Sequence, residues 1–219
     1  MKKHLSPPTL TNGRPLPNNS DQRAKRERIL TAALKLFAHE PYQAVTMDRV
    51  ASASGVAKGT LYLYFPSKDA LYLGILSDNL DTGYRTIQAG ADPKLPLVER
   101  VRRAITVTVE FYDQRRDFLQ FYAIEEPRLA DARNRVMEEA RERSSNFFES
   151  LIQDGIRSGF FAPVDPRVAT LAIQGSIRSL LLYYGASRPV AEISRELGDL
   201  MLKSLGANSA QFFKPTHQQ

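Results

Sequence analysis

The sequence predicts an all-α protein, and three observations carry that prediction. Apolar residues recur at helical spacing, as Ile29, Ala33, Leu36 and Phe37 do at i, i+4, i+7 and i+8. No stretch alternates polar and apolar residues for long enough to make a convincing strand. From residue 96 to residue 189, prolines stand at the starts of helical segments or between them, where a missing N–H does little harm.

The composition is that of an ordinary globular chain, with 42% hydrophobic and 25% charged residues among 219. The absence of cysteine excludes disulfides, thiolate metal sites and a cysteine nucleophile. His4, His39 and His217 are scattered, so we expect no metal site, and nothing in the sequence indicates a cofactor. No apolar run is long enough to span a membrane, and the N-terminus lacks the apolar segment of a signal peptide. We therefore expect a soluble, cytoplasmic protein.

The first helices are predicted from their caps and breaks. Residues 1–20 contain four prolines and should form a flexible arm. Ser20 or Asp21 can cap a first helix, which Pro41 ends. Thr46 then opens a short second helix.

The next elements follow a tight turn. In the turn Ser54-Gly55-Val56, glycine supplies a positive φ without steric cost. A third short helix runs from Lys58 to Phe65, where Pro66 ends it. Ser67 can cap a fourth helix that begins near Lys68 and continues to about Gln88, and residues 90–93 break the chain. Beyond this break, we predict helices over 95–114, 117–125, 127–157, 166–185 and 189–205.

The excess positive charge lies in the first third of the chain. Residues 1–69 carry 11 Lys+Arg and 5 Asp+Glu, whereas residues 70–219 carry 19 of each. This asymmetry indicates a segment that meets a polyanion, or else a basic surface that only aids solubility.

The two short helices around the glycine turn have the spacing of a helix-turn-helix, whose second helix enters the DNA major groove. Lys58 would add a cation, Gly59 would let the backbone approach DNA, and Thr60 could bond a base edge or a phosphate. Tyr62 and Tyr64 offer hydroxyls for the sugar-phosphate backbone. The alternative is a pair of ordinary core helices, with Tyr62 a core aromatic.

The motifs of residues 22–76 resemble, in order and spacing, the tetracycline-repressor (TetR) family of bacterial transcriptional regulators. The matching stretches are Arg28-Ile29-Leu30-Thr31-Ala32-Ala33-Leu34-Lys35-Leu36-Phe37-Ala38, Tyr42, Val45-Thr46-Met47, Val50-Ala51, Gly55-Val56-Ala57-Lys58-Gly59-Thr60-Leu61-Tyr62-Leu63-Tyr64-Phe65 and Ser67-Lys68-Asp69-Ala70-Leu71. The resemblance implies a homodimer with an N-terminal DNA-binding domain and a C-terminal effector domain. The expected division is a basic arm (1–20), a three-helix DNA-binding domain (21–67), a connecting helix (68–90), a helical effector-binding and dimerisation domain (91–206) and a polar tail (207–219).

The resemblance also implies roles for individual residues. The resemblance implies that Thr46 caps the second helix and touches a phosphate, and that Lys68 binds another phosphate. It implies that Lys58, Gly59 and Thr60 lie at the major groove. Tyr62 and Tyr64 would contact the DNA backbone. Three positions depart from the family pattern: Pro41 replaces a usual glycine, Ala57 a frequent serine, and Leu63 a polar or aromatic residue. The change at Ala57 removes a side-chain cap worth ~1 kcal/mol.

Seven basic residues precede or open the first helix: Lys2, Lys3, Arg14, Arg23, Lys25, Arg26 and Arg28. One hypothesis is that the arm follows phosphates or enters the minor groove. The other is a disordered tail that adds only non-specific attraction to DNA.

Aromatic residues at helical spacing mark a candidate effector pocket in the C-terminal part, although such a stripe is also typical of an ordinary core. The candidate ligand-binding residues are Glu110, Phe111, Phe118, Gln120, Tyr122, Phe147 and Gln174. Aromatic walls would suit an apolar or planar small molecule.

The last two helices, 166–185 and 189–205, resemble the pair with which family members dimerise, and small residues in 168–182 would allow close helix approach. Two helices from each subunit would form a four-helix bundle. Arg178 would be either an ion-pair partner in this interface, which we favour, or an anion-binding group in a pocket. Dimer symmetry predicts a palindromic DNA operator.

Other functional classes fit less well. No Gly-x-Ser-x-Gly turn is present, and the pairs Glu125-Glu126 and Glu138-Glu139 point different ways on a helix, so we expect no catalytic residues and no enzyme. A ligand-independent architectural DNA-binding dimer remains the main alternative to a ligand-released repressor.

Overall fold

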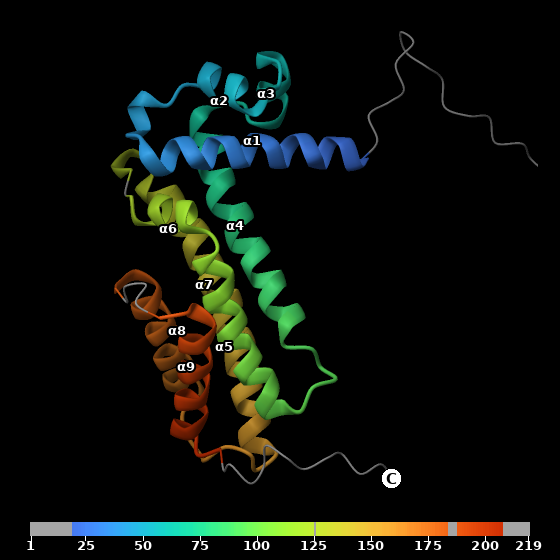
Figure 1. Ribbon diagram of the computed structural model, residues 1–219, viewed down its shortest axis with the longest axis vertical. Helices are drawn as coiled ribbons and strands as arrows, with labels where there is room; N and C mark the ends of the chain where they lie inside the picture. The colour runs from blue at the N-terminus through green and yellow to red at the C-terminus, as the bar shows by residue number, and fades with distance from the viewer. Residues whose placement is uncertain (1–18, 125, 184–187, 208–219) are drawn as a thin grey trace, which may run out of the picture.

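The computed structural model describes residues 19–124, 126–183 and 188–207, and within these ranges the secondary structure is helical, with no strand. Figure 1 shows the arrangement of the helices. The α-helices are α1 (Asn19–His39), α2 (Met47–Ser54), α3 (Lys58–Tyr64), α4 (Lys68–Gly90), α5 (Leu97–Asp113), α6 (Arg116–Ala123), α7 (Ala130–Arg157), α8 (Pro166–Tyr183) and α9 (Val190–Ser204), with short 3₁₀ helices η1 (Tyr42–Ala44) and η2 (Pro127–Leu129).

The molecule is elongated, with α1–α3 at one end (Figure 1). Helix α4 leads from that end along the body, where it packs against α5 and α7. Helices α8 and α9 lie on the other side of this layer, α8 mainly against α7 and α9 mainly against α5. The end that carries the helix-turn-helix thus lies away from α8 and α9 (Figure 1).

Two buried clusters hold the helices together. In the first, Ile29, Ala33 and Phe37 are buried as their spacing predicts, and they pack with α2, α3 and the first turns of α4. This cluster also contains Phe118 and Phe121 of α6, so the N-terminal helices are not packed independently of the rest. The second cluster joins α5, α7, α8 and α9 with the end of α4.

The caps of the helix-turn-helix are confirmed. The Thr46 side chain accepts a hydrogen bond from the Arg49 N–H at 3.3 Å and begins α2. Gly55 has a φ of 65°, the left-handed conformation that glycine adopts without strain. Ser67 accepts from the Ala70 N–H at 3.0 Å and begins α4, whereas Ala57 provides no side-chain cap for α3.

Some expected boundaries differ. The first helix begins at Asn19, so Ser20 and Asp21 lie inside its first turn instead of capping it. The turn after α1 is built as the 3₁₀ helix η1, with Pro41 as its N-cap at a φ of −56°. The expected helix over 127–157 begins with the 3₁₀ turn η2, where Pro127 occupies the first position.

Several expectations fall on positions outside the described residues. These are the arm up to residue 18, with Lys2, Lys3 and Arg14, the ends of the segments predicted at 125 and 185, and the tail from residue 208. Within the described part of the chain, no helix has the length and apolar character needed to cross a membrane. No cluster of three or more potential metal-ligating side chains occurs in those same ranges.

Candidate DNA-binding surface and effector pocket

Helix α3 is held against the N-terminal core by Leu61, which is fully buried. Its other side chains differ in exposure: Lys58, Tyr62 and Leu63 are exposed, whereas Tyr64 is half-buried against the core. Leu63, in the last turn of α3, is 86% exposed. The face that α3 presents to solvent is therefore mixed, with one cation, one phenol and one apolar side chain.

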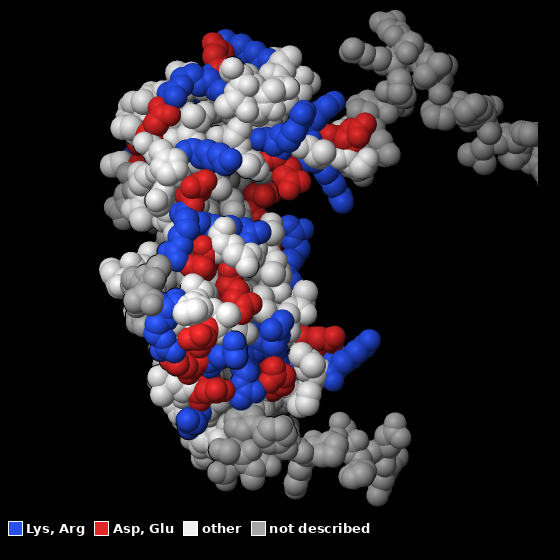
Figure 2. Space-filling model, viewed as in Figure 1, with Lys and Arg blue, Asp and Glu red and all other residues white. Residues whose placement is uncertain are grey.

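The candidate DNA-contacting residues Gly59 and Thr60 also lie on this helix. Gly59 is exposed, and an added Cβ would meet nothing within 4 Å, so the backbone there is open to approach. Thr60 is half-buried. Figure 2 shows mostly uncharged surface over α3, with Lys and Arg side chains along the neighbouring α1. In the described segment 19–69, eight Lys+Arg stand against five Asp+Glu.

Lys58 is paired within the protein. Its Nζ lies 2.7 Å from Oδ1 of Asp48 on α2, and both side chains are mostly exposed. The hydrogen bond to this carboxylate raises the pKa of Lys58, so the side chain stays cationic at neutral pH. A phosphate that binds Lys58 must therefore compete with Asp48.

Lys68 makes hydrogen bonds within the protein that its sequence motif does not predict. Its Nζ donates to the backbone oxygens of Tyr42, at 2.6 Å, and Val45, at 2.7 Å, and lies 4.1 Å from the centre of the Tyr42 ring. Burial lowers the pKa of Lys68. Two of the three ammonium N–H groups thus tie the start of α4 to the segment between α1 and α2, which leaves one for a phosphate.

A second set of contacts surrounds the same segment. The Tyr42 hydroxyl donates to Asp69, and the Arg128 guanidinium donates to both carboxylate oxygens of Asp69 at 2.9 and 3.0 Å. The Tyr42 hydroxyl and Arg128 hold the pKa of Asp69 below its usual value, while burial and Asp69 raise the pKa of Tyr42. We call Tyr42, Lys68, Asp69 and Arg128 the junction, because they join the helix-turn-helix, α4 and η2.

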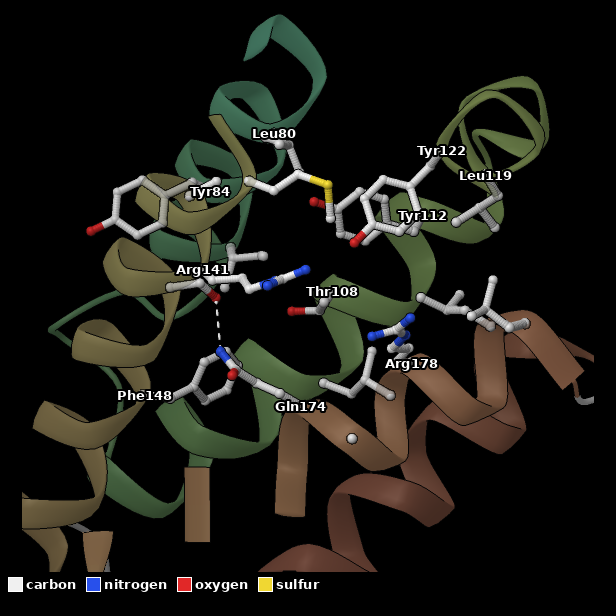
Figure 3. Close-up of a pocket in the computed structure, with 18 of the residues that line it drawn as sticks. Leu80, Tyr84, Thr108, Tyr112, Leu119, Tyr122, Arg141, Phe148, Gln174 and Arg178 are labelled. Atoms are coloured by element: carbon white, nitrogen blue, oxygen red, sulfur yellow. Dashed lines mark hydrogen bonds between the residues drawn. The ribbon is translucent and has the colours of Figure 1, made fainter. Parts of the chain in front are cut away.

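A cavity of about 380 Å³ lies between α4, α5, α6, α7 and α8. Figure 3 shows side chains from these helices pointing into it. The lining residues are Leu80, Tyr84, Ile87, Thr108, Tyr112, Phe118, Leu119, Tyr122, Met137, Ala140, Arg141, Ser144, Phe148, Leu171, Gln174, Gly175, Ile177, Arg178, Leu181 and Leu182. Its volume is near the lower end of the ~300–1,000 Å³ typical of ligand sites, and its walls are mainly apolar, as such sites usually are.

Three of the seven candidate pocket residues line this cavity: Phe118, Tyr122 and Gln174. The Gln174 side chain is held to α7, since its Oε1 accepts from the Ser145 hydroxyl and its Nε2 donates to the Ser144 hydroxyl, each at 3.2 Å. Figure 3 shows it at the cavity wall.

The other four candidates do not line the cavity. Phe111 is buried beneath the Arg115 guanidinium, whose carbon lies 3.7 Å from the ring centre, and Phe147 packs edge-on against Tyr84. Gln120 is exposed and Glu110 is half-buried on the outer part of α5. Helical rotation explains the position of Phe111 and Phe147, because the next residues along the chain, Tyr112 and Phe148, face the cavity instead.

Several lining residues were missed by sequence reasoning. Thr108 and Tyr112 bring hydroxyls into the cavity from α5, and burial raises the pKa of Tyr112 to about 12, so its hydroxyl is neutral at neutral pH. The Thr108 hydroxyl donates to the Ala104 carbonyl at 2.6 Å and can still accept. The aromatic run around Tyr112 was the available signal; for Arg141, an arginine within a charged helix, there was none.

Arg178 lines the cavity from α8, and its guanidinium points into it (Figure 3), which is the geometry of the anion-binding interpretation. The ion pair in a subunit interface stays a prediction. Arg141 points into the same cavity from α7 (Figure 3).

Two family models match the chain. Residues 29–75 match the model described as bacterial regulatory proteins of the tetR family, and residues 94–205 match the tetracyclin repressor-like C-terminal domain. The chain belongs to the TetR family. It is thus a helix-turn-helix transcriptional regulator, and the resemblance found in residues 22–76 is confirmed.

Individual relatives agree with this TetR-family assignment. The chain is 28% identical over 187 residues to the HTH-type transcriptional regulator YhgD of Bacillus subtilis, covering 84% of this chain and 98% of that one. It is 26% identical over 145 residues to the HTH-type transcriptional repressor KstR2 of Mycolicibacterium smegmatis, covering 66% and 71% of the two chains. Among solved structures, the fatty acid degradation regulator FadR from Bacillus halodurans superposes with a TM-score of 0.73 at 19% identity, over 84% of this chain and 97% of that one.

The two C-terminal helices of this TetR-family chain expose apolar side chains. Val168 on α8 is 63% exposed and Leu200 on α9 is 59% exposed, and Leu171 and Tyr183 are also largely exposed. A large apolar side chain in solvent is informative when several lie on neighbouring elements, because such surfaces often mark interaction sites.

Proposed function

We propose that this TetR-family protein is a repressor that binds a palindromic operator as a homodimer through α3 and is released by a small molecule in the cavity. The observation that carries the DNA-binding part is the exposed face of α3. Lys58, Tyr62 and Leu63 project from a helix that Leu61 anchors in the core. A helix presented in this way after a fixed glycine turn suits entry into the major groove.

The dimer part of the proposal rests on α8 and α9. Val168, Ala172, Gly175 and Ser179 recur along the exposed side of α8 at i, i+4, i+7 and i+11, and Leu200 adds an apolar side chain from α9. Small residues in such a stripe allow close approach of a second helix, so these two helices are suited to a four-helix bundle with their symmetry mates. Two recognition helices would then meet half-sites one or more DNA turns apart, at roughly 34–36 Å per turn.

The release mechanism uses two helices that reach from the cavity to the DNA-binding end. Helix α4 carries the lining residues Leu80 and Tyr84 and begins at Lys68, in the junction. Helix α6 carries Phe118, which lines the cavity and also belongs to the core around α1. A ligand that favours one position of α4 and α6 would change the separation of the two α3 helices, with a coupling of typically ~1–3 kcal/mol.

The relative KstR2 is named a transcriptional repressor. This supports repression over activation as the role that we propose for this chain. The cavity supports a ligand-responsive regulator over an architectural DNA-binding protein, because its walls combine an apolar lining with inward-pointing polar groups.

Substitutions on α3 test the DNA-binding part. Lys58→Ala should weaken operator binding and flatten its salt dependence by about one phosphate contact, whereas Thr60→Val should alter site preference more than the salt slope. Lys94→Ala, an exposed lysine between α4 and α5, is the matched control and should change neither. Affinity measured across a salt series reports both quantities. Unchanged binding in both α3 variants would contradict the assignment.

A further inference from the structure

The side chains of two arginines line the cavity, and no acidic side chain lines it. Figure 3 shows Arg141 on α7 and Arg178 on α8 directing their guanidinium groups into the cavity from different walls. None of the lining residues is Asp or Glu. Neither arginine has a hydrogen bond or an ion pair with any other residue in the described ranges.

Three other arginines of α7 bind groups of the protein, which Arg141 does not within the described part of the chain. Arg143 pairs with Asp81 at 2.5 Å, Arg133 donates to the Tyr122 carbonyl at 2.6 Å, and Arg157 pairs with Asp154. Arg141 lies two residues from Arg143 and therefore points away from the Asp81 partner, toward the cavity.

The other lining residues indicate what kind of molecule would carry a charged group into the cavity. Around the arginines are aliphatic and aromatic walls, among them Leu80, Ile87, Met137 and Phe148. The hydroxyl of Tyr112 and the hydrogen-bonded amide of Gln174 add neutral polar groups. Both arginines are also exposed to solvent, so water can hydrate them in the absence of a ligand. Two cations beside apolar walls repel a cationic ligand and attract an anionic one.

We propose that the cavity binds a small organic acid with an apolar body, and that its carboxylate lies between Arg141 and Arg178. The inference deepens the proposed function, since it names the chemical class of the effector. The planar guanidinium donates two parallel hydrogen bonds to a carboxylate, so two of them satisfy both of its oxygens. The apolar body then occupies the side of the cavity lined by Leu80, Ile87 and Met137.

The test compares an acid with its neutral counterpart. Isothermal titration calorimetry of the full-length protein would measure decanoate against decanol, and 2-naphthoate against 2-naphthol, at fixed pH and salt. Charge-assisted hydrogen bonds to a carboxylate should make each bound acid at least about 10-fold tighter than its alcohol. Binding of the decanoate pair would indicate an aliphatic body for the effector, and binding of the 2-naphthoate pair would indicate an aromatic one.

Variants assign the effect to the two arginines. Arg141→Gln and Arg178→Gln should each weaken the bound acid about 10-fold and leave its alcohol unchanged. Arg135→Gln, an exposed arginine on α7 outside the cavity lining, is the matched control and should change neither affinity. Ala140→Phe, which puts a larger side chain at the cavity wall, should weaken acid and alcohol alike. Circular dichroism and the mass in solution would show that each variant is folded and assembled.

Three results would overturn the inference: no acid binds at millimolar concentration, acids bind no better than their alcohols, or the arginine variants keep the acid preference. These outcomes are separate from the proposed function, because operator binding by the ligand-free protein is measured on its own. A protein that binds DNA but shows no acid preference loses only this inference. A protein that binds acids but no operator loses the proposed function.

Discussion

Leu63 on α3 has the chemistry of a base-reading residue rather than of a backbone contact. An exposed leucine side chain cannot hydrogen-bond a phosphate, but it can pack against the C5-methyl group of thymine in the major groove. Its 86% exposure leaves the whole side chain available for such a contact.

The proposed contact of Leu63 with thymine is tested by changing both the protein and the DNA. Replacing one thymine of the operator by deoxyuridine removes the methyl group, and this should weaken binding by the unchanged protein about fourfold at that position, or about 0.8 kcal/mol. The Leu63→Ala variant should bind both DNAs equally. Scanning each operator thymine by competition binding would measure this. If no position distinguishes the unchanged protein from the variant, Leu63 does not read thymine.

Asp69 makes the junction sensitive to acid. The Tyr42 hydroxyl and Arg128 lower its pKa in the folded protein, below the unfolded value of about 3.9. The pairing therefore stabilises the fold at neutral pH, and its contribution is lost as the pH falls through the folded-state pKa.

Asp69→Asn should thus lower the free energy of unfolding at pH 7, and the difference from the unchanged protein should shrink as the pH falls below about 4 and through the folded-state pKa. Urea unfolding at several pH values measures that difference. Glu139→Gln, at an exposed position in the middle of α7, is the control and should show little difference at either neutral or acidic pH. A difference at Asp69 that persists unchanged into acid would mean that its charge contributes nothing.

At the level of elements, the sequence determines where helices begin and end more firmly than which way they face. Thr46, Gly55 and Ser67 act as expected, because a cap or a positive φ is a local property that one residue can satisfy. Helical periodicity marks a residue as buried but does not say whether it faces a core or a cavity. For this reason the periodicity indicates Phe111 as well as Tyr112, of which only Tyr112 lines the cavity.

Long-range contacts were the part that could not be predicted. The Lys68 ammonium bonds carbonyls of residues 42 and 45, which are 26 and 23 positions away in sequence, and only the folded arrangement of α1, η1 and α4 brings them together. Arg141 likewise had no sequence signal, since the sequence of a charged helix does not show which of its exposed arginines lies beside a cavity.

Helices α4 and α5 approach closely at Gly83, and this contact gives a test at the element scale. A Cβ at Gly83 would lie 2.8 Å from the Tyr112 hydroxyl oxygen and 3.0 Å from the Phe111 ring. Gly83→Ala should therefore destabilise the protein by about 1 kcal/mol, because overpacking outweighs the gain in helix propensity. Thermal or urea unfolding would measure the loss.

The matched control is Gly59→Ala on α3, where an added Cβ meets nothing within 4 Å. That variant should be unchanged or more stable by up to about 0.5 kcal/mol. Equal effects of the two substitutions would mean that α4 and α5 are not in tight contact at Gly83.

At the scale of the whole molecule, binding a palindromic operator requires a second copy of the chain. Combining Val168→Glu with Leu200→Glu places charge on the exposed apolar side chains of α8 and α9, and burying those charges in an interface would be costly. The double variant should sediment as a monomer and lose most of its operator affinity, because one recognition helix reads only one half-site. Analytical ultracentrifugation measures the mass directly.

Asn146→Glu introduces a charge at an exposed position of α7 and should leave the dimer intact. A double variant that remains dimeric would exclude α8 and α9 as the interface, while leaving DNA binding through α3 to be judged separately.

The most direct test of the central claim, specific DNA binding through α3, is a selection of genomic fragments by the purified protein beside its Tyr62→Ala variant. Sequencing the bound fragments should reveal one enriched palindrome with the unchanged protein and no such enrichment with the variant. If both proteins enrich the same fragments, or neither enriches a palindrome, the helix-turn-helix of this chain is not the sequence-reading surface described above.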